Sequence, residues 1–152
     1  MANDKDTLTA SRQDEGKESD MAGPVRITLT ATLQGNVIKI TGPGDVDIPE
    51  GQAATPFDFT LNDTTDKNVK FASLDAADNS TSCPPPAGQN STQIEGVQIH
   101  NNQTPRSAGF TDKNSNDPNQ GDLKISYAWN FTCDPGATVD QYDPIITNGG
   151  RA

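Results

Sequence analysis

The sequence predicts an all-β protein, a sandwich of two antiparallel sheets with an immunoglobulin-like or jelly-roll topology. Three observations favour this class. Short segments alternate between apolar and polar residues, the period of two that places every apolar side chain on one face of a strand. Turn signals made of Gly, Pro, Asn and Asp separate these segments at short intervals. No segment with helical periodicity competes with them in residues 25–150.

The first half of the chain carries two predicted hairpins. Apolar residues alternate with polar ones over 25–33, and Gly35 and Asn36 form the turn into a second strand at 37–41. A loop rich in Gly, Asp and Pro follows. The strands of the second hairpin are predicted at 57–61 and 69–74.

The second half begins with a predicted loop at 75–91, because its three consecutive prolines cannot donate to a strand ladder. Gly96 predicts a β-bulge in the strand that follows. The clearest alternation starts at Leu123, where apolar residues up to Cys133 share one face. The remaining strands are predicted at 94–99, around Phe110, at 123–133 and, as a closing edge strand, at 143–146.

The composition predicts one domain with a thin core. The chain has 152 residues and a formal net charge of -10, and Leu, Ile, Val and Phe together supply only 26 of the 152 residues. That share is below the roughly 20% at which a highly charged chain starts to resemble a disordered one. We therefore expect a single sandwich domain over residues 23–150 and a separate polar segment over residues 1–22.

Residues 1–20 contain three basic and six acidic side chains, and Leu8 is their only large aliphatic residue. Such a segment cannot bury enough apolar area to offset the entropy of ordering it. Two interpretations stay open. The segment is either a flexible tail or an arm that becomes ordered by docking on a neighbouring subunit, with Leu8 between two threonines as a β-prone anchor.

The acidic composition also restricts the partners. Nucleic acid is excluded because its phosphates require a basic surface, and this chain has no cluster of Lys or Arg. No apolar run approaches the roughly 18 to 20 residues of a membrane-spanning helix, and the first residues lack the apolar stretch of a signal peptide. We expect no membrane span. We expect a protein partner, which can be a second copy of the chain. The compartment stays open.

The sequence predicts no catalytic function. His100 is the only histidine and follows a predicted strand, as a solvated residue would, and no nucleophile elbow, phosphate loop or zinc motif is present. Tyr127 and Trp129 alternate with apolar residues, so we assign them to the core rather than to a sugar-stacking surface.

Two cysteines, Cys83 and Cys133, stand fifty positions apart without metal-ligand spacing. A disulfide between them would connect the proline-rich loop to the sandwich and close about 50 residues, for roughly 4 kcal/mol in the chain-entropy model. Free thiols are the alternative.

The loop between Asp112 and Asp122 is the strongest candidate binding site. Oxygen-bearing side chains at alternating positions are what Ca²⁺ needs to collect six to eight ligands. An EF-hand would have glycine sixth and glutamate twelfth, where this loop has Asp117 and Leu123. The alternative is a polar loop whose side chains bond their own backbone. The candidate ligands are Asp112, Asn114, Asn116, Asp117 and Asp122; no other cofactor is expected.

Two segments near the C-terminus resemble a known family. The first runs from Gly109 through Thr111, Asp112 and Asn114 to the strand containing Tyr127, and the second is Tyr142 to Asn148 with Asp-Pro-Ile-Ile-Thr-Asn at its end. This pattern is similar to that of the DP-EP family, small bacterial β-sandwich proteins of unknown function. In this chain Gly149 and Gly150 stand where that family has Glu-Pro. The resemblance implies a fold and no activity.

Taken together, these observations predict a non-catalytic structural or interaction protein that self-assembles or belongs to a larger assembly. The alternative is a ligand-binding module, which would bind Ca²⁺ through the 112–122 loop or bind a glycan.

Overall fold

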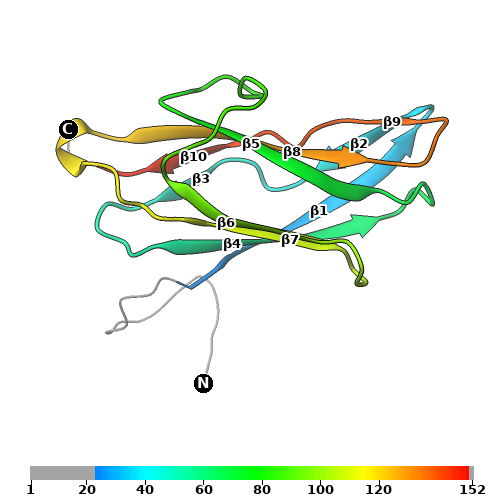
Figure 1. Ribbon diagram of the computed structural model, residues 1–152, viewed down its shortest axis with the longest axis horizontal. Helices are drawn as coiled ribbons and strands as arrows, with labels where there is room; N and C mark the ends of the chain where they lie inside the picture. Colours follow the sequence, from blue (N-terminus) through cyan, green and yellow to red (C-terminus); the bar gives the residue numbers. More distant parts are fainter. Residues whose placement is uncertain (1–22, 151–152) are drawn as a thin grey trace.

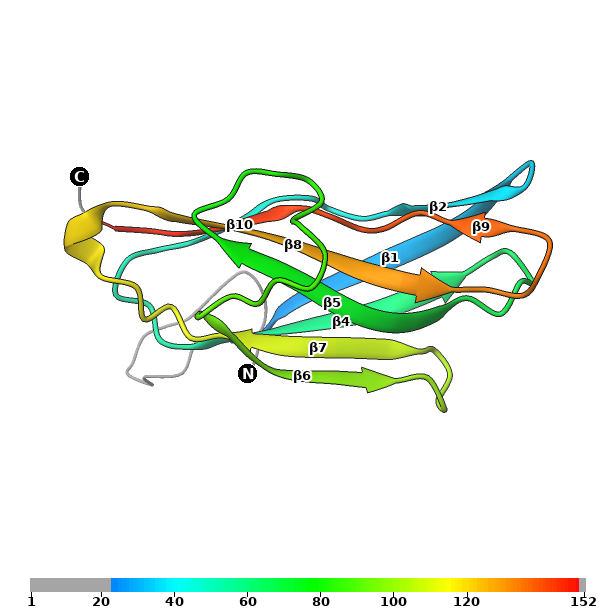
Figure 2. The same cartoon turned by 45° about the horizontal axis from the view of Figure 1, so that its top comes forward.

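The computed structural model describes residues 23–150 and confirms the predicted fold class. The chain is almost entirely β, and two sheets pack against each other as two layers (Figures 1 and 2). The polar segment predicted for residues 1–22 lies outside the described residues. No helix in the described part of the chain is long and apolar enough to cross a membrane.

One layer is a six-stranded sheet in the order β6-β7-β4-β1-β2-β9. The predicted first hairpin is confirmed, because β1 and β2 pair antiparallel around Gly35, whose φ of 64° suits glycine. The bulge at Gly96 is also confirmed by a register shift between Glu95 and Gln98. The strands of this sheet are β1 (Val25–Gln34), β2 (Val37–Thr41), β4 (Thr55–Asp63), β6 (Ile94–His100), β7 (Ser107–Asp112) and β9 (Thr138–Val139).

The other layer is a four-stranded sheet in the order β3-β10-β8-β5. The long strand β8 has the predicted inward face, with Ile125, Tyr127 and Trp129 fully buried. Its outward residue Ser126 is buried as well, because its hydroxyl bonds that of Ser80 in the loop after β5. The strands are β3 (Val46–Ile48), β5 (Lys70–Asp78), β8 (Leu123–Thr132) and β10 (Ile145–Asn148).

Several sequence predictions about strand partners are wrong. β4 and β5 do not form the second hairpin, since β4 pairs with β1 and β7 whereas β5 pairs with β8 in the other sheet. β10 is not an edge strand, because it lies between β3 and β8. β5 extends four residues into the predicted loop, and β3 and the one-turn 3₁₀ helix η1 (Pro118–Gln120) lie in segments assigned to loops. The pairs β1–β4, β2–β9 and β3–β10 are parallel, within otherwise antiparallel sheets.

The space between the sheets is filled mainly by aromatic rings. Phe59 lies at the centre of this cluster, with its ring centroid 5.5 Å from that of Trp129 and 5.4 Å from that of Phe110. Phe71 joins the cluster from β5, at 5.2 Å from Trp129. All eight aromatic residues of the chain are buried, and burial of such rings gives the largest apolar contribution per residue.

We expect Phe59→Ala to lower the free energy of unfolding by about 3 to 5 kcal/mol. The neighbouring rings are held in place by further rings, so they cannot move in to fill the cavity that the substitution leaves. Chemical denaturation measures the loss. Leu33→Ala is the control, since Leu33 is 37% exposed on the same sheet and its truncation should cost less than about 0.5 kcal/mol. Equal losses in the two variants would show that the interior is not cooperatively packed around Phe59.

Candidate functional site

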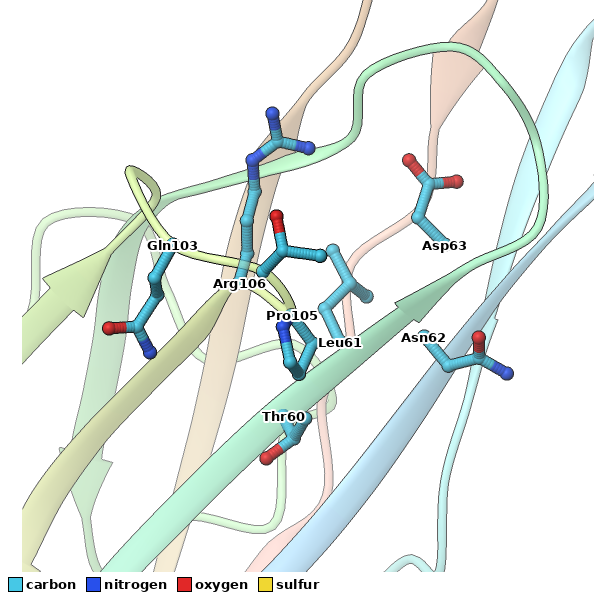
Figure 3. Close-up of a pocket in the computed structure, with 8 residues that line it drawn as sticks. Thr60, Leu61, Asn62, Asp63, Gln103, Pro105 and Arg106 are labelled. Carbon is cyan, nitrogen blue, oxygen red and sulfur yellow. The ribbon is translucent and has the colours of Figure 1, made fainter.

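The outer face of the six-stranded sheet contains two adjoining hollows. One, of about 410 Å³, lies between the end of β4 and the turn that joins β6 to β7 (Figure 3). The other, of about 450 Å³, extends across β1, β4, β7 and β6. The two hollows share Thr60, Gln103 and Pro105, so they form one continuous depression on this face. Its combined size is within the range of small-molecule and peptide sites.

Strand register places the polar side chains of this face in two rows across the sheet. Arg26, Asp58, Gly109 and Gln98 are paired in succession from β1 to β6. The neighbouring row contains Thr28, Thr60, Ser107 and His100 in the same strand order. Among residues 23–150, the side chains of Arg26 and Asp58 make no hydrogen bond or ion pair, and both are exposed. The depression therefore offers one free cation and one free carboxylate.

Gly109 makes the floor of the depression. A Cβ atom at this position would lie 2.8 Å from the carbonyl oxygen of Phe57 on the neighbouring strand, so the backbones of β7 and β4 leave no room for a side chain. The outward positions of β7 thus carry only small side chains next to the larger ones of β4 and β6, and this difference in size produces the hollow.

The rim of the smaller hollow is held rigidly between the two sheets. Arg106 donates from Nε to the carbonyl of Asn101 at 3.1 Å, from Nη1 to the carbonyl of Val69 at 3.2 Å and from Nη2 to Oδ1 of Asn68 at 2.6 Å. Asn101 bonds both the N–H and the carbonyl of Phe71, at 3.1 and 2.8 Å. These two side chains connect the β6–β7 turn to β5, and their polar groups are used for structure rather than for binding.

Asp63 stabilises the turn on the other side of the same hollow. Its carboxylate accepts hydrogen bonds from the N–H and the hydroxyl of Thr65, at 2.9 and 2.6 Å, and from the N–H of Val69 at 3.0 Å. Burial alone would raise the pKa of Asp63, but these bonds and the nearby Arg106 outweigh it, so the pKa lies below its ordinary value of 3.8.

The predicted Ca²⁺ ligands of the 112–122 loop have different hydrogen-bond partners in the structure. Asp117 accepts from the N–H of Asn119 and caps η1, and Asp122 accepts from the N–H of Gly150. The amide nitrogen of Asn114 donates to the carbonyls of Pro49 and Gln52, which fastens the loop to the β3–β4 connection. No group of three His, Cys, Asp or Glu side chains within residues 23–150 is arranged to hold a metal.

Asp112 and Asn116 differ from the other three, because their polar atoms are buried. Asp112 is fully buried at the end of β7, where its Oδ1 accepts from the backbone N–H of Asn114 and from Nδ2 of Asn148 at 2.9 Å. Burial raises the pKa of the Asp112 carboxyl, against the bonds from Asn148 and Asn114, and the nearby Asp78 carboxylate raises it further. The role of Asn148, which lies 36 positions away, was not predictable from the pattern of the loop.

The predicted disulfide is not formed, and both cysteines are free thiols. The N–H of Ser80 bonds the carbonyl of Lys124 at 3.2 Å, so Cys83, three residues after Ser80, lies at most about 18 Å from Lys124. Cys133 follows the opposite end of β8, nine residues after Lys124 and about 30 Å from it along the strand. The gap exceeds the roughly 7 Å that a disulfide spans between Cα atoms. Burial and the nearby Asp143 and Asp45 raise the pKa of the exposed Cys83 thiol.

Tyr127 and Trp129 are fully buried, as the core assignment predicted. His100 is exposed, and its Nε2 lies 3.2 Å from Oε1 of Gln98 at the border of the depression. The depression itself was not predicted from the sequence. The sequence feature that could have indicated it is the polar half of each alternating segment, because these residues form the exposed face of the sheet. Small residues, Thr, Ser and Gly, recur among them.

Comparisons with protein-family models and with curated proteins find no match for this chain. The resemblance to the DP-EP family therefore stays a prediction. Its two segments meet in the structure, since Asp112 belongs to the first and Asn148 to the second. Gly150 has no room for a side chain, because a Cβ there would lie 2.1 Å from the carbonyl oxygen of Gly121.

We expect Gly109→Ala to reduce the free energy of unfolding by about 1 to 3 kcal/mol, since the added methyl group must push apart two paired backbones. Gly23→Ala is the matched control, because a Cβ there meets nothing within 4 Å. Thermal or chemical unfolding of both variants measures the difference. A Gly109→Ala variant as stable as the parent would mean that β4 and β7 can separate without cost.

We expect Asp63→Asn to be about 1 to 2 kcal/mol less stable than the parent at neutral pH, because an amide nitrogen would face the N–H groups that the carboxylate now accepts. Since the folded pKa is lowered from 3.8, this stabilisation is present above pH 3.8 and is lost as the pH falls through the folded value. Unfolding measured from pH 7 to pH 2 should show that the difference in stability between the parent and Asp63→Asn becomes smaller towards pH 2. Asp58→Asn is the control, because Asp58 is exposed and has no partner among residues 23–150, and it should be as stable as the parent at neutral pH.

Proposed function

We propose that this protein is a non-catalytic interaction protein that self-assembles by adding an extended segment of a second copy to the open edge of β6. The observation that carries the proposal is the exposed edge of β6, which holds the exposed apolar side chain of Val97 beside a polar depression. Two further predictions belong to this proposal, membership of the DP-EP family of small bacterial β-sandwich proteins and an immunoglobulin-like or jelly-roll topology.

The four sheet edges of the described chain differ in accessibility. β9 and β3 have only two and three residues. β5 is long, but its edge is covered, because Asn101 bonds both polar groups of Phe71 and the carbonyl of Gln89 accepts from the N–H of Ala76. β6 has seven residues and pairs with β7 alone. An edge of this length presents free N–H and carbonyl groups for another strand.

Val97 supports the role of β6 in binding. It is 46% exposed and one of two large apolar side chains that the described residues expose, the other being Leu33. The bulge at Gly96 turns this part of the strand, and Gln98 and His100 follow it along the depression. A strand added here would cover Val97, and its next side chains would reach the polar depression.

The partner segment that fits best is residues 1–20 of a second copy. Fully extended, 20 residues reach about 70 Å, several times the roughly 23 Å of a seven-residue strand. Leu8 between Thr7 and Thr9 supplies one apolar, β-prone position in an otherwise polar segment, which matches the single exposed Val97 of β6.

A glycan or another small polar ligand is the second candidate, and the depression favours it. Arg26, Asp58 and Thr60 supply donors and acceptors on a hollow of about 450 Å³. All the aromatic side chains are buried, so such a ligand would be bound by hydrogen bonds without ring stacking.

Absolute mass from light scattering on a sizing column tests the proposal. We expect the full chain to form a dimer or larger assembly, and the chain that starts at Met21 to be monomeric. Val97→Lys in the full chain should also be monomeric with an unchanged melting temperature, because a charge on an edge strand opposes strand addition.

Leu33→Lys is the matched control, since it places the same charge on the other exposed apolar residue and should leave the assembly intact. Assembly that survives both the truncation and Val97→Lys would contradict the proposal, as would a full chain that is monomeric at roughly millimolar concentration.

A further inference from the structure

A buried polar cluster lies at the end of the sandwich where β7 and β10 finish. Asp112 and Asn148 are both 0% exposed, and Nδ2 of Asn148 donates to Oδ1 of Asp112 at 2.9 Å. Both side chains occupy positions where the alternation of their strands directs them inward. A carboxylate and an amide thus replace apolar residues at one end of the core.

Three side chains of this region have buried oxygen atoms without a hydrogen-bond partner. They are Oδ2 of Asp112, Oδ1 of Asn148 and Oδ1 of Asn116, whose Nδ2 is also unpaired. The large majority of buried side-chain polar atoms are hydrogen-bonded, so three unpaired oxygens within one short loop and the strand end bonded to it require an explanation. Two of them belong to side chains that are already bonded to each other.

The electrostatics of the cluster favour a positive charge. The charged neighbour that acts on Asp112 within residues 23–150 is Asp78, a second carboxylate, whose own oxygens accept from Ser91 and Thr92. A buried carboxylate is stable when it is paired, neutralised or bound to a metal. A cation bound to Oδ2 would balance the charge of Asp112 and would give a partner to an oxygen that has none.

We propose that Asp112 Oδ2, Asn148 Oδ1 and Asn116 Oδ1 bind a hard cation, Ca²⁺, at the end of the sandwich. Carboxylate and amide oxygens are the ligands that Ca²⁺ prefers, at about 2.4 Å, with backbone carbonyls and water completing the shell. The site is independent of strand addition at β6. It also differs from the ligand set predicted for the 112–122 loop, because Asn114, Asp117 and Asp122 bond the backbone and Asn148 comes from another strand.

Thermal unfolding and isothermal titration of the full chain, first freed of metal with a chelator, test the site. We expect CaCl₂ at millimolar concentration to raise the melting temperature by several degrees and to give saturable heat, because binding to the folded state stabilises it. Asp112→Asn should abolish both signals. It should also unfold at a temperature no lower than the metal-free parent, since it removes an unpaired buried charge while keeping the shape of the side chain.

Asp122→Asn is the matched control, because the same change is made at an exposed carboxylate of the same loop, and it should keep the full response to Ca²⁺. Asn148→Asp adds a second buried carboxylate, so we expect a lower melting temperature without metal and a larger rise with Ca²⁺. MgCl₂ and NaCl, run in parallel, show which hard cation the site selects, and a larger response to either of these than to Ca²⁺ would overturn the assignment of Ca²⁺. A parent protein that responds to none of the three salts would overturn the site, as would an Asp112→Asn variant that responds like the parent.

Discussion

The packing of eight aromatic rings between the two sheets is the interaction on which the rest of the structure depends. The chain is poor in aliphatic residues, and all of its Phe, Tyr and Trp side chains are buried. Phe59 contacts rings from both sheets, among them Phe110 of its own sheet and Trp129 of the other. Because the interior takes up nearly all the large apolar side chains of the described residues, with Leu33 and Val97 as exceptions, the outer faces are mainly polar, and so is the depression above β4 and β7.

The strands could be predicted from the sequence because alternation depends on each segment alone. β1, β2, β4, β6 and β8 lie close to the segments that alternate. Alternation determines which side of a strand faces the core but not which strand lies beside it. The segments of β4 and β5 follow each other along the chain and were expected to pair, yet each is placed in a different sheet. β3 has only three residues, too few for a periodic pattern to be recognised.

The candidate sites were less predictable, because they depend on contacts between distant segments. A depression formed by outward side chains of four strands requires the register, which no single segment specifies. The 112–122 loop was recognised by its oxygen-bearing residues, but the pattern could not show that Asp117 would cap η1 while Asp112 turns inward. The prediction of a disulfide was wrong for the same reason, since the distance between Cys83 and Cys133 depends on the direction in which β8 runs.

Strand β7 connects the depression, the aromatic cluster and the buried polar cluster, because its alternate residues face opposite sides of the sheet. Gly109 faces outward and makes the floor of the depression, while Phe110 faces inward and packs on the aromatic cluster. Two positions later, Asp112 also faces inward, at a position where the alternation of apolar and polar residues along the strand predicts an apolar residue. A polar residue at such a position lowers stability unless something compensates it, and these departures from the pattern concentrate at functional sites. Asn148 departs in the same way at the end of β10 and bonds Asp112. Two independent strands that break the same rule at the same point are the observation on which the proposed cation site rests.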